Sequence, residues 1–91
     1  MNRESITCRR VNFGEMEKVG DFSFADNLKH INIWLPGQLS PDAIQITTDK
    51  GRNEPRIWFW DGNQEQPTIT PSIHLVGHWH GHLTAGKLIS V

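Results

Sequence analysis

The chain has 91 residues, with nine basic and ten acidic side chains and a formal net charge of −1 at pH 7. This length makes one domain with a small core, and the balanced charge argues against general binding to nucleic-acid phosphates. No apolar run approaches the ~20 residues of a membrane span, so we expect no contact with a membrane.

The N-terminal part carries few regular patterns. The residues from Met1 to Ser5 lack the apolar stretch of a signal peptide. Residues 5–13 mix apolar side chains with arginines, as in an edge strand. A single cysteine, Cys8, excludes an internal disulfide and fits the reducing cytoplasm. Its neighbours Arg9 and Arg10 would lower the pKa of the thiol, but without a partner group we expect it to be inert.

Two alternating segments follow. In residues 30–35, Ile31, Ile33 and Leu35 alternate with His30, Asn32 and Trp34, which predicts a strand with one apolar face. Pro36 and Gly37 then favour a turn. Residues 43–48 alternate again and predict a second strand, and the polar segment 49–55 predicts a turn.

The second half predicts further strands. Residues 56–60 are aromatic and apolar on both faces, as in a central strand. Residues 67–71 contain two prolines and predict an irregular extended crossing, because each proline removes a backbone donor. Short strands are expected at 72–76, 79–84 and 87–91. With about six to eight short strands and no helical period, we expect an all-β fold, either a small barrel or a two-layer antiparallel sheet with little helix.

The core should come from the apolar faces of these strands. The face of the strand at 56–60 that points inward stays open, because both of its faces are apolar. We expect much of the core to consist of Ile31, Ile33, Ile44, Ile46, Ile57, Phe59 and Ile73, with Trp58 and Trp60 also packed rather than forming a ligand surface.

An ordered set of motifs runs through the second half: W-x-W-x-G from Trp58, P-T-x-x-P-S-I from Pro67, and W-H-G-x-L-T-x-G from Trp79. Together they resemble a small family of unknown function found in phages, prophages and bacteria. The resemblance covers about residues 30–91 and leaves residues 1–29 as an N-terminal extension that packs on the family-like region. It implies the host cytoplasm as the location if a phage encodes the protein.

The resemblance also implies a zinc site that this chain has lost. Many relatives carry a Cys-Pro-x-Cys knuckle after the first strand and a Cys-His pair near the end. Here Leu35 and Gln38 flank the Pro-Gly turn, and Trp79 precedes His80. Because a structural zinc site needs four nitrogen or sulfur ligands, we infer that Leu35 and Trp79 fill the space.

Four of the five histidines lie within nine residues, at positions 74, 78, 80 and 82. On an extended strand they would share one face. His80 with His78 or His82, completed by His74, His30, Asp61 or Asp26 from elsewhere, would then hold zinc or another transition metal. The alternative that we favour places Gly77 and Gly81 in turns, which leaves the histidines as polar surface residues. A role in proton transfer is a third alternative.

Other residues suggest partner binding or catalysis. Trp34 shares a strand face with polar residues, so we predict a partner-binding surface of Trp34, His30, His78 and His82. Thr68, Thr70 and Ser72 would form a nucleophile loop if a histidine adjoined them, but no triad can be assigned. We therefore name no catalytic residue and expect these hydroxyls to satisfy backbone groups.

Three functions remain after this reading. The first is a non-catalytic, phage-type accessory protein that binds a host or phage macromolecule without a cofactor, for instance to inhibit a host defence protein. The second is a histidine-based metal-binding domain, and the third is a small hydrolase or metabolite-binding protein. We expect a protein partner rather than nucleic acid or membrane, and short β edges allow a homodimer.

Overall fold

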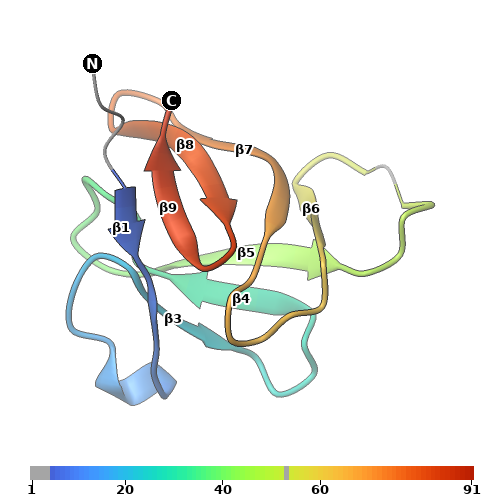
Figure 1. The fold of residues 1–91 in the computed structure, drawn as a ribbon, viewed down its shortest axis with the longest axis horizontal. Coiled ribbons are helices and arrows are strands. Elements are labelled where there is room, and N and C mark those ends of the chain that lie inside the picture. Colours follow the sequence, from blue (N-terminus) through green and yellow to red (C-terminus); the bar gives the residue numbers. More distant parts are fainter. Residues whose placement is uncertain (1–4, 53) are drawn as a thin grey trace.

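Nine strands form one sheet that curls into a nearly closed barrel, in a computed structural model that describes residues 5–52 and 54–91 (Figure 1). The order across the sheet is β1-β9-β8-β7-β6-β5-β4-β3-β2. The elements are β1 (Ser5–Thr7), β2 (Arg9–Arg10), the 3-10 helix η1 (Phe13–Glu15), β3 (Asp21–Phe24), β4 (His30–Ile33), β5 (Asp42–Thr47), β6 (Ile57–Trp60), β7 (Ile69–Leu75), β8 (Trp79–Thr84) and β9 (Lys87–Ser90).

This confirms the expected all-β fold, with more strands than the sequence predicted. The segment expected as one edge strand divides at Cys8 into β1 and β2, and β3 was not foreseen. In Figure 1, β7, β8, β9 and β1 stand across β3, β4 and β5. The apolar side chains of the two groups meet between them, which places the core inside the barrel.

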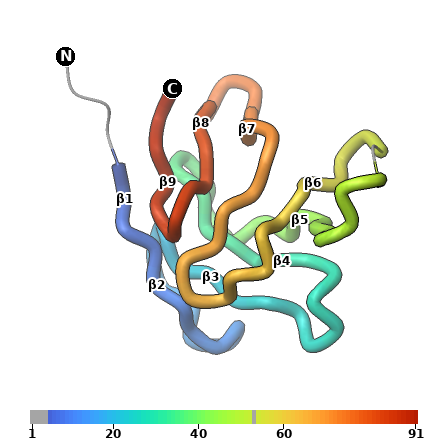
Figure 2. Tube along the Cα trace, turned by 45° about the vertical axis from the view of Figure 1, so that its right-hand side comes forward, coloured from blue at the N-terminus to red at the C-terminus, as the bar shows by residue number. Residues whose placement is uncertain are grey.

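The N-terminal segment closes the barrel. β1 pairs antiparallel with β9, and β2 pairs parallel with β3, so consecutive residues join the two ends of the sheet order (Figure 2). At the junction the Cys8 N–H donates to the Gly86 carbonyl at 2.9 Å, and the Arg9 N–H donates to the Gly20 carbonyl at 3.0 Å. The outermost strands of the sheet order, β1 and β2, are thus adjacent in sequence, and each pairs with one end of the remaining sheet.

An ion pair between a buried carboxylate, Asp21, and a half-exposed arginine, Arg9, anchors this closure. The Asp21 side chain is fully buried and accepts hydrogen bonds from Arg9 Nε at 3.0 Å and Arg9 Nη2 at 2.8 Å. The backbone N–H groups of Glu17 and Lys18 donate to the same carboxylate. The Arg9 guanidinium, with these backbone donors, lowers the pKa of Asp21 to about 2 despite burial. The carboxylate therefore stays charged and holds the first loop against the barrel.

The core confirms most of the expected residues and corrects two. Ile31, Ile33, Ile44, Ile46 and Ile73 are buried as expected, with Phe22, Leu35, Trp60, Ile69, Leu83 and Leu88 added from other strands. Ile57 and Phe59 are only half-buried, which corrects that part of the expectation. Strand β6 turns its tryptophan face inward instead, because Trp60 fills the interior and stacks near Phe24, at 4.8 Å between ring centroids.

The proline-containing segment also differs from expectation. Residues 67–71 were predicted to cross irregularly, yet β7 begins at Ile69 and includes Pro71. The strand accommodates the proline through a register shift between Ile69 and Ile73, and the Thr70-Pro71 peptide bond is cis. Beyond Thr70 the pairing with β6 ends, so Pro71 is not required to donate a ladder hydrogen bond on that side.

Two sequence-based expectations lie outside the described residues, namely the reading of Met1 to Glu4 and the part of the 49–55 turn at position 53. Within residues 5–52 and 54–91 there is no helix with the length and apolar character needed to cross a membrane.

Candidate active site

The candidate functional side chains lie on the hairpin of β7 and β8. The chain reverses at Gly77, whose φ of +79° suits glycine, and the His78 N–H donates to the Leu75 carbonyl at 2.9 Å. The register sets His74 opposite His80. Since alternate residues of a strand share a face, Ser72, His74, His80 and His82 all project from the outer face of the hairpin.

Ser72 and His80 form a hydrogen-bonded pair on that face. His80 Nε2 lies 3.0 Å from Ser72 Oγ. Ser72 stands two residues before His74 and thus diagonal to His80, a spacing that a side chain as long as histidine spans. Ser72 is half-buried and His80 is exposed, so a substrate can reach both. This distance is the one expected between a nucleophile and its general base.

The His80 ring is positioned by a second histidine. The rings of His74 and His80 stack with centroids 4.6 Å apart and an interplanar angle of 24°. Among residues 5–52 and 54–91, no carboxylate is hydrogen-bonded to His80. We call this hydrogen-bonded pair of Ser72 and His80, with the His74 ring stacked on its histidine, the serine–histidine dyad.

A tryptophan from β6 supports the serine backbone. Trp58 Nε1 donates to the Ser72 carbonyl at 3.3 Å, and the Trp58 side chain packs against the core. The contact ties β6 to β7 beyond the last ladder pair, Phe59 with Thr70. Trp58 thereby fixes the strand on which the serine stands.

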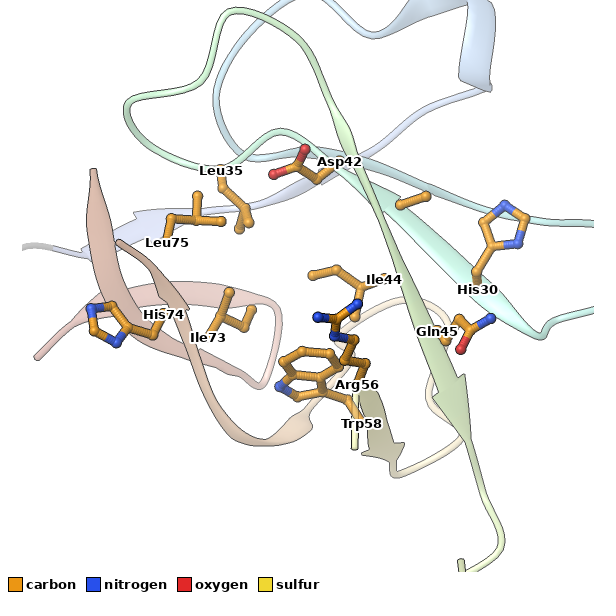
Figure 3. A pocket seen from close by; sticks show the side chains of 11 residues that line it. His30, Leu35, Asp42, Ile44, Gln45, Arg56, Trp58, Ile73, His74 and Leu75 are labelled. Atoms are coloured by element: carbon orange, nitrogen blue, oxygen red, sulfur yellow. The ribbon is translucent and has the colours of Figure 1, made fainter. Parts of the chain in front are cut away.

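A groove lies on the β6 side of β7, and its lining includes Ile73, His74 and Leu75, the residues that follow Ser72 (Figure 3). Its volume is about 740 Å³, within the range of ligand sites. In Figure 3 the side chains of Leu35, Ile44, Ile73, Leu75 and Trp58 surround the groove, and Arg56 lies beside the Trp58 ring. The full lining is His30, Leu35, Asp42, Ala43, Ile44, Gln45, Arg56, Trp58, Ile73, His74 and Leu75.

The predicted metal ligands are only partly brought together. His80 and His82 share a face of β8, whereas His78 lies in the turn before it. Gly81 is a strand residue and not a turn residue as favoured above, so the shared face survives for three of the four histidines. In the described part of the chain, no three histidine, cysteine, aspartate or glutamate side chains are grouped to hold a metal. Zinc binding by His78, His80 and His82 stays a prediction.

The predicted partner-binding residues are spread over the molecule. Trp34 is half-buried, and its indole Nε1 donates to the Gln38 carbonyl at 3.0 Å. His30 is half-buried and lines the groove, whereas His78 is exposed beside Gly37. His82 is half-buried on the same face as His80. Their role in partner binding stays a prediction.

The positions assigned to lost zinc ligands are filled by apolar packing. Leu35 is fully buried, and Trp79 packs against the core. A Cβ at Gly37 would lie 3.3 Å from the His78 Cβ, so the two segments touch. These contacts support the inference that side chains occupy the space.

Cys8 has the opposite acid–base character to the one that its arginines suggested. Burial raises the pKa of the Cys8 thiol to about 11, while Arg9 is engaged with Asp21. The thiol therefore stays protonated at neutral pH, in agreement with the expectation that it is inert.

Ser72 is the candidate residue that the sequence analysis considered as part of a nucleophile loop and then set aside. Thr68 behaves as expected, because its Oγ1 accepts a hydrogen bond from the Ala85 N–H at 2.8 Å. Ser72 instead meets a histidine. The available signal was the hairpin itself: a turn centred on Gly77 sets His74 opposite His80 and leaves Ser72 one diagonal away. Both dyad residues also belong to the motifs quoted above.

Fold and site together define a small β-barrel domain that carries a serine–histidine pair beside a groove. A family model described as "Bacterial ubiquitination-like system serine protease (BubE)" matches residues 37–91. The match covers more than half of the chain, so the protein belongs to this family. It includes β5 to β9 and therefore both Ser72 and His80.

Comparison with curated proteins found no match, and comparison with solved structures found none either. The family match agrees with the resemblance in its location on the C-terminal part of the chain. It connects the chain with a bacterial ubiquitination-like system, whereas the link to phages stays a prediction.

Proposed function

We propose that this protein is a serine protease in which Ser72 is the nucleophile and His80 the general base. The observation that carries the proposal is the 3.0 Å contact between His80 Nε2 and Ser72 Oγ on an accessible hairpin face. The description of the family, which names a serine protease, supports it. The accessory-protein hypothesis has no comparable geometric observation in its favour.

The chemistry follows from the two side chains. His80 Nε2 accepts the hydroxyl proton as Ser72 Oγ attacks the carbonyl carbon of the substrate. The protonated ring then delivers that proton to the leaving amine, and an acyl-serine remains. Water, deprotonated by the same nitrogen, releases the acid and restores the hydroxyl. Stacking on His74 restricts the orientations open to the His80 ring.

Covalent labelling with a fluorophosphonate tests the assignment, because this probe reacts with activated serines independently of peptide preference. We expect wild-type protein to be labelled at Ser72, Ser72→Ala to be unlabelled, and His80→Ala to be labelled at least about 100-fold more slowly. Ser40→Ala and His82→Ala are matched controls: Ser40 is exposed in a loop, and His82 shares the face of His80. Labelling of wild type no faster than of Ser72→Ala would overturn the proposal.

A further inference from the structure

The groove beside the dyad is a gap in the barrel that has the dimensions of a missing strand. β6 pairs with β5 only at residues 45–47 and with β7 only at residues 69–70. Before Ile57 the chain leaves the sheet through a turn at Pro55 and Arg56. Residues 42–44 of β5 and 73–75 of β7 therefore face each other without a strand between them, and both segments line the groove.

The β7 side of this gap offers backbone groups for pairing. The His80 carbonyl accepts the Val91 N–H on the β9 side, so the His80 backbone groups point away from β7. The opposite residue, His74, is then in a non-hydrogen-bonded pair, and its own N–H and C=O point away from β8. They point towards the groove that His74 lines. An extended peptide lying there would find a donor and an acceptor in strand geometry.

A large part of the groove lining is apolar, although Asp42 and Arg56 also line it. Leu35 and Ile44 come from the core, Ile73 and Leu75 come from the inward face of β7, and Trp58 forms one wall. A side chain that enters from a bound strand would be removed from water by these residues, and a large apolar one gains most from this burial. Ser72 and His80 do not line the groove, but two lining residues touch them: Trp58 donates to the Ser72 carbonyl, and His74 stacks on His80.

We infer that the groove between β5 and β7 binds an extended segment of the polypeptide substrate as an added strand in line with β6, with a bulky apolar side chain in its interior. This inference rests on the proposed protease function and specifies its substrate class. Main-chain pairing at His74 supplies affinity, and the apolar interior supplies selectivity, as in other cases of strand addition. The bound segment would deliver its scissile carbonyl to Ser72, which lies on β7 two residues before His74.

A library of acetyl-tetrapeptidyl aminomethylcoumarin amides tests the selectivity. We expect cleavage to depend on one position of the peptide, with leucine, isoleucine, phenylalanine or tryptophan preferred at least about tenfold over aspartate. A flat preference would overturn the inference, and so would a complete lack of cleavage by protein that fluorophosphonate labels at Ser72.

A filled groove provides the second test. Ala43 is exposed and lines the groove, so Ala43→Trp should obstruct it without disturbing the core. We expect kcat/KM for the preferred peptide to fall at least about tenfold, with fluorophosphonate labelling within about twofold of wild type. Leu39→Trp is the matched control, since Leu39 is 97% exposed outside the groove. Unchanged cleavage by a folded Ala43→Trp variant would refute the docking site.

A backbone test on wild-type protein covers the case in which Ala43→Trp does not fold. Preferred peptides methylated at one backbone nitrogen at a time should lose cleavage at alternate positions, because a paired strand directs every second N–H to its neighbour. Uniform tolerance of methylation would exclude strand addition. Loss of fluorophosphonate labelling reports on Ser72 and His80 alone, so failure of the dyad and failure of the groove give different results.

Discussion

Gly81 lies beneath the Trp79 indole, and we predict that Gly81→Ala destabilises the barrel strongly. Gly81 is buried in β8, directly after His80. A Cβ at this position would overlap the Trp79 ring and the Ile89 carbonyl oxygen. The first obstacle is a side chain, but the second is the backbone of the paired strand, since Gly81 pairs with Ser90 in β9. Neither rotation of a side chain nor a small strand shift relieves both.

The magnitude follows from three contributions. Overpacking in a close-packed interior costs about 1–3 kcal/mol. Displacing the indole removes the hydrogen bond from Trp79 Nε1 to Ser90 Oγ, which is 2.9 Å long and worth about 0.5–1.5 kcal/mol. Replacing glycine lowers the entropy of the unfolded chain and returns about 0.4–1 kcal/mol. We therefore expect a net loss of about 2 kcal/mol in the free energy of unfolding, or about 8 to 16 °C in Tm for a domain of this size.

Thermal and urea unfolding, followed by circular dichroism, measure this loss. Gly14→Ala is the matched control, because a Cβ at Gly14 has no atom within 4 Å. We expect the control to stay within about 0.5 kcal/mol of wild type. If Gly81→Ala melted within about 2 °C of wild type, the close packing of Trp79 on Gly81, and with it the reason for a glycine beside His80, would be refuted.

Three further predictions concern charge and the thiol. Asp21→Asn should cost about 2–3 kcal/mol at pH 7, because it removes charge-assisted hydrogen bonds to a buried carboxylate. Folding lowers the pKa of Asp21 from its usual 3.8 to about 2. The carboxylate's contribution to the free energy of unfolding is therefore complete above about pH 4 and disappears as the pH falls towards 2. Urea titrations at several pH values should accordingly show the stabilities of wild type and Asp21→Asn converging in acid. Cys8 should react with Ellman's reagent at pH 8 much more slowly in folded than in urea-unfolded protein, because burial raises the pKa of its thiol to about 11; equal rates would contradict this. Arg52→Ala should change the unfolding free energy by less than about 0.5 kcal/mol, as its ion pair with Glu54 is exposed on both sides; a larger loss in urea titration would show an unrecognised role.

Local patterns predicted much of the barrel. The alternation around Ile31 and Ile33, and around Ile44 and Ile46, identified β4 and β5 and their buried faces. Both strands have one apolar and one polar face, so the residue type at each position indicates whether its side chain points into the core or towards solvent. In β6 both faces are apolar, and the choice between Ile57 and Trp60 was left to the packing against Phe24.

The candidate site shows the same division. The histidine cluster is apparent in the sequence, whereas the contact of His80 with Ser72 is not. Ser72 carries no local sign of reactivity, since it follows a proline and lacks the glycines of a nucleophile elbow. The pairing of β7 with β8 across the turn at Gly77 supplies the neighbour that the linear sequence lacks.

By itself, the sequence determined the class of fold, the hairpin turn and the residue types available for chemistry, because these depend on periodicity and on single residues. The tertiary structure alone decided which residues of β5 and β7 lie beyond the reach of β6. It also decided how Ser72 meets His80 across the hairpin and where the groove opens. These depend on pairing between distant segments, and the geometry of such pairing is fixed only when all nine strands share one barrel.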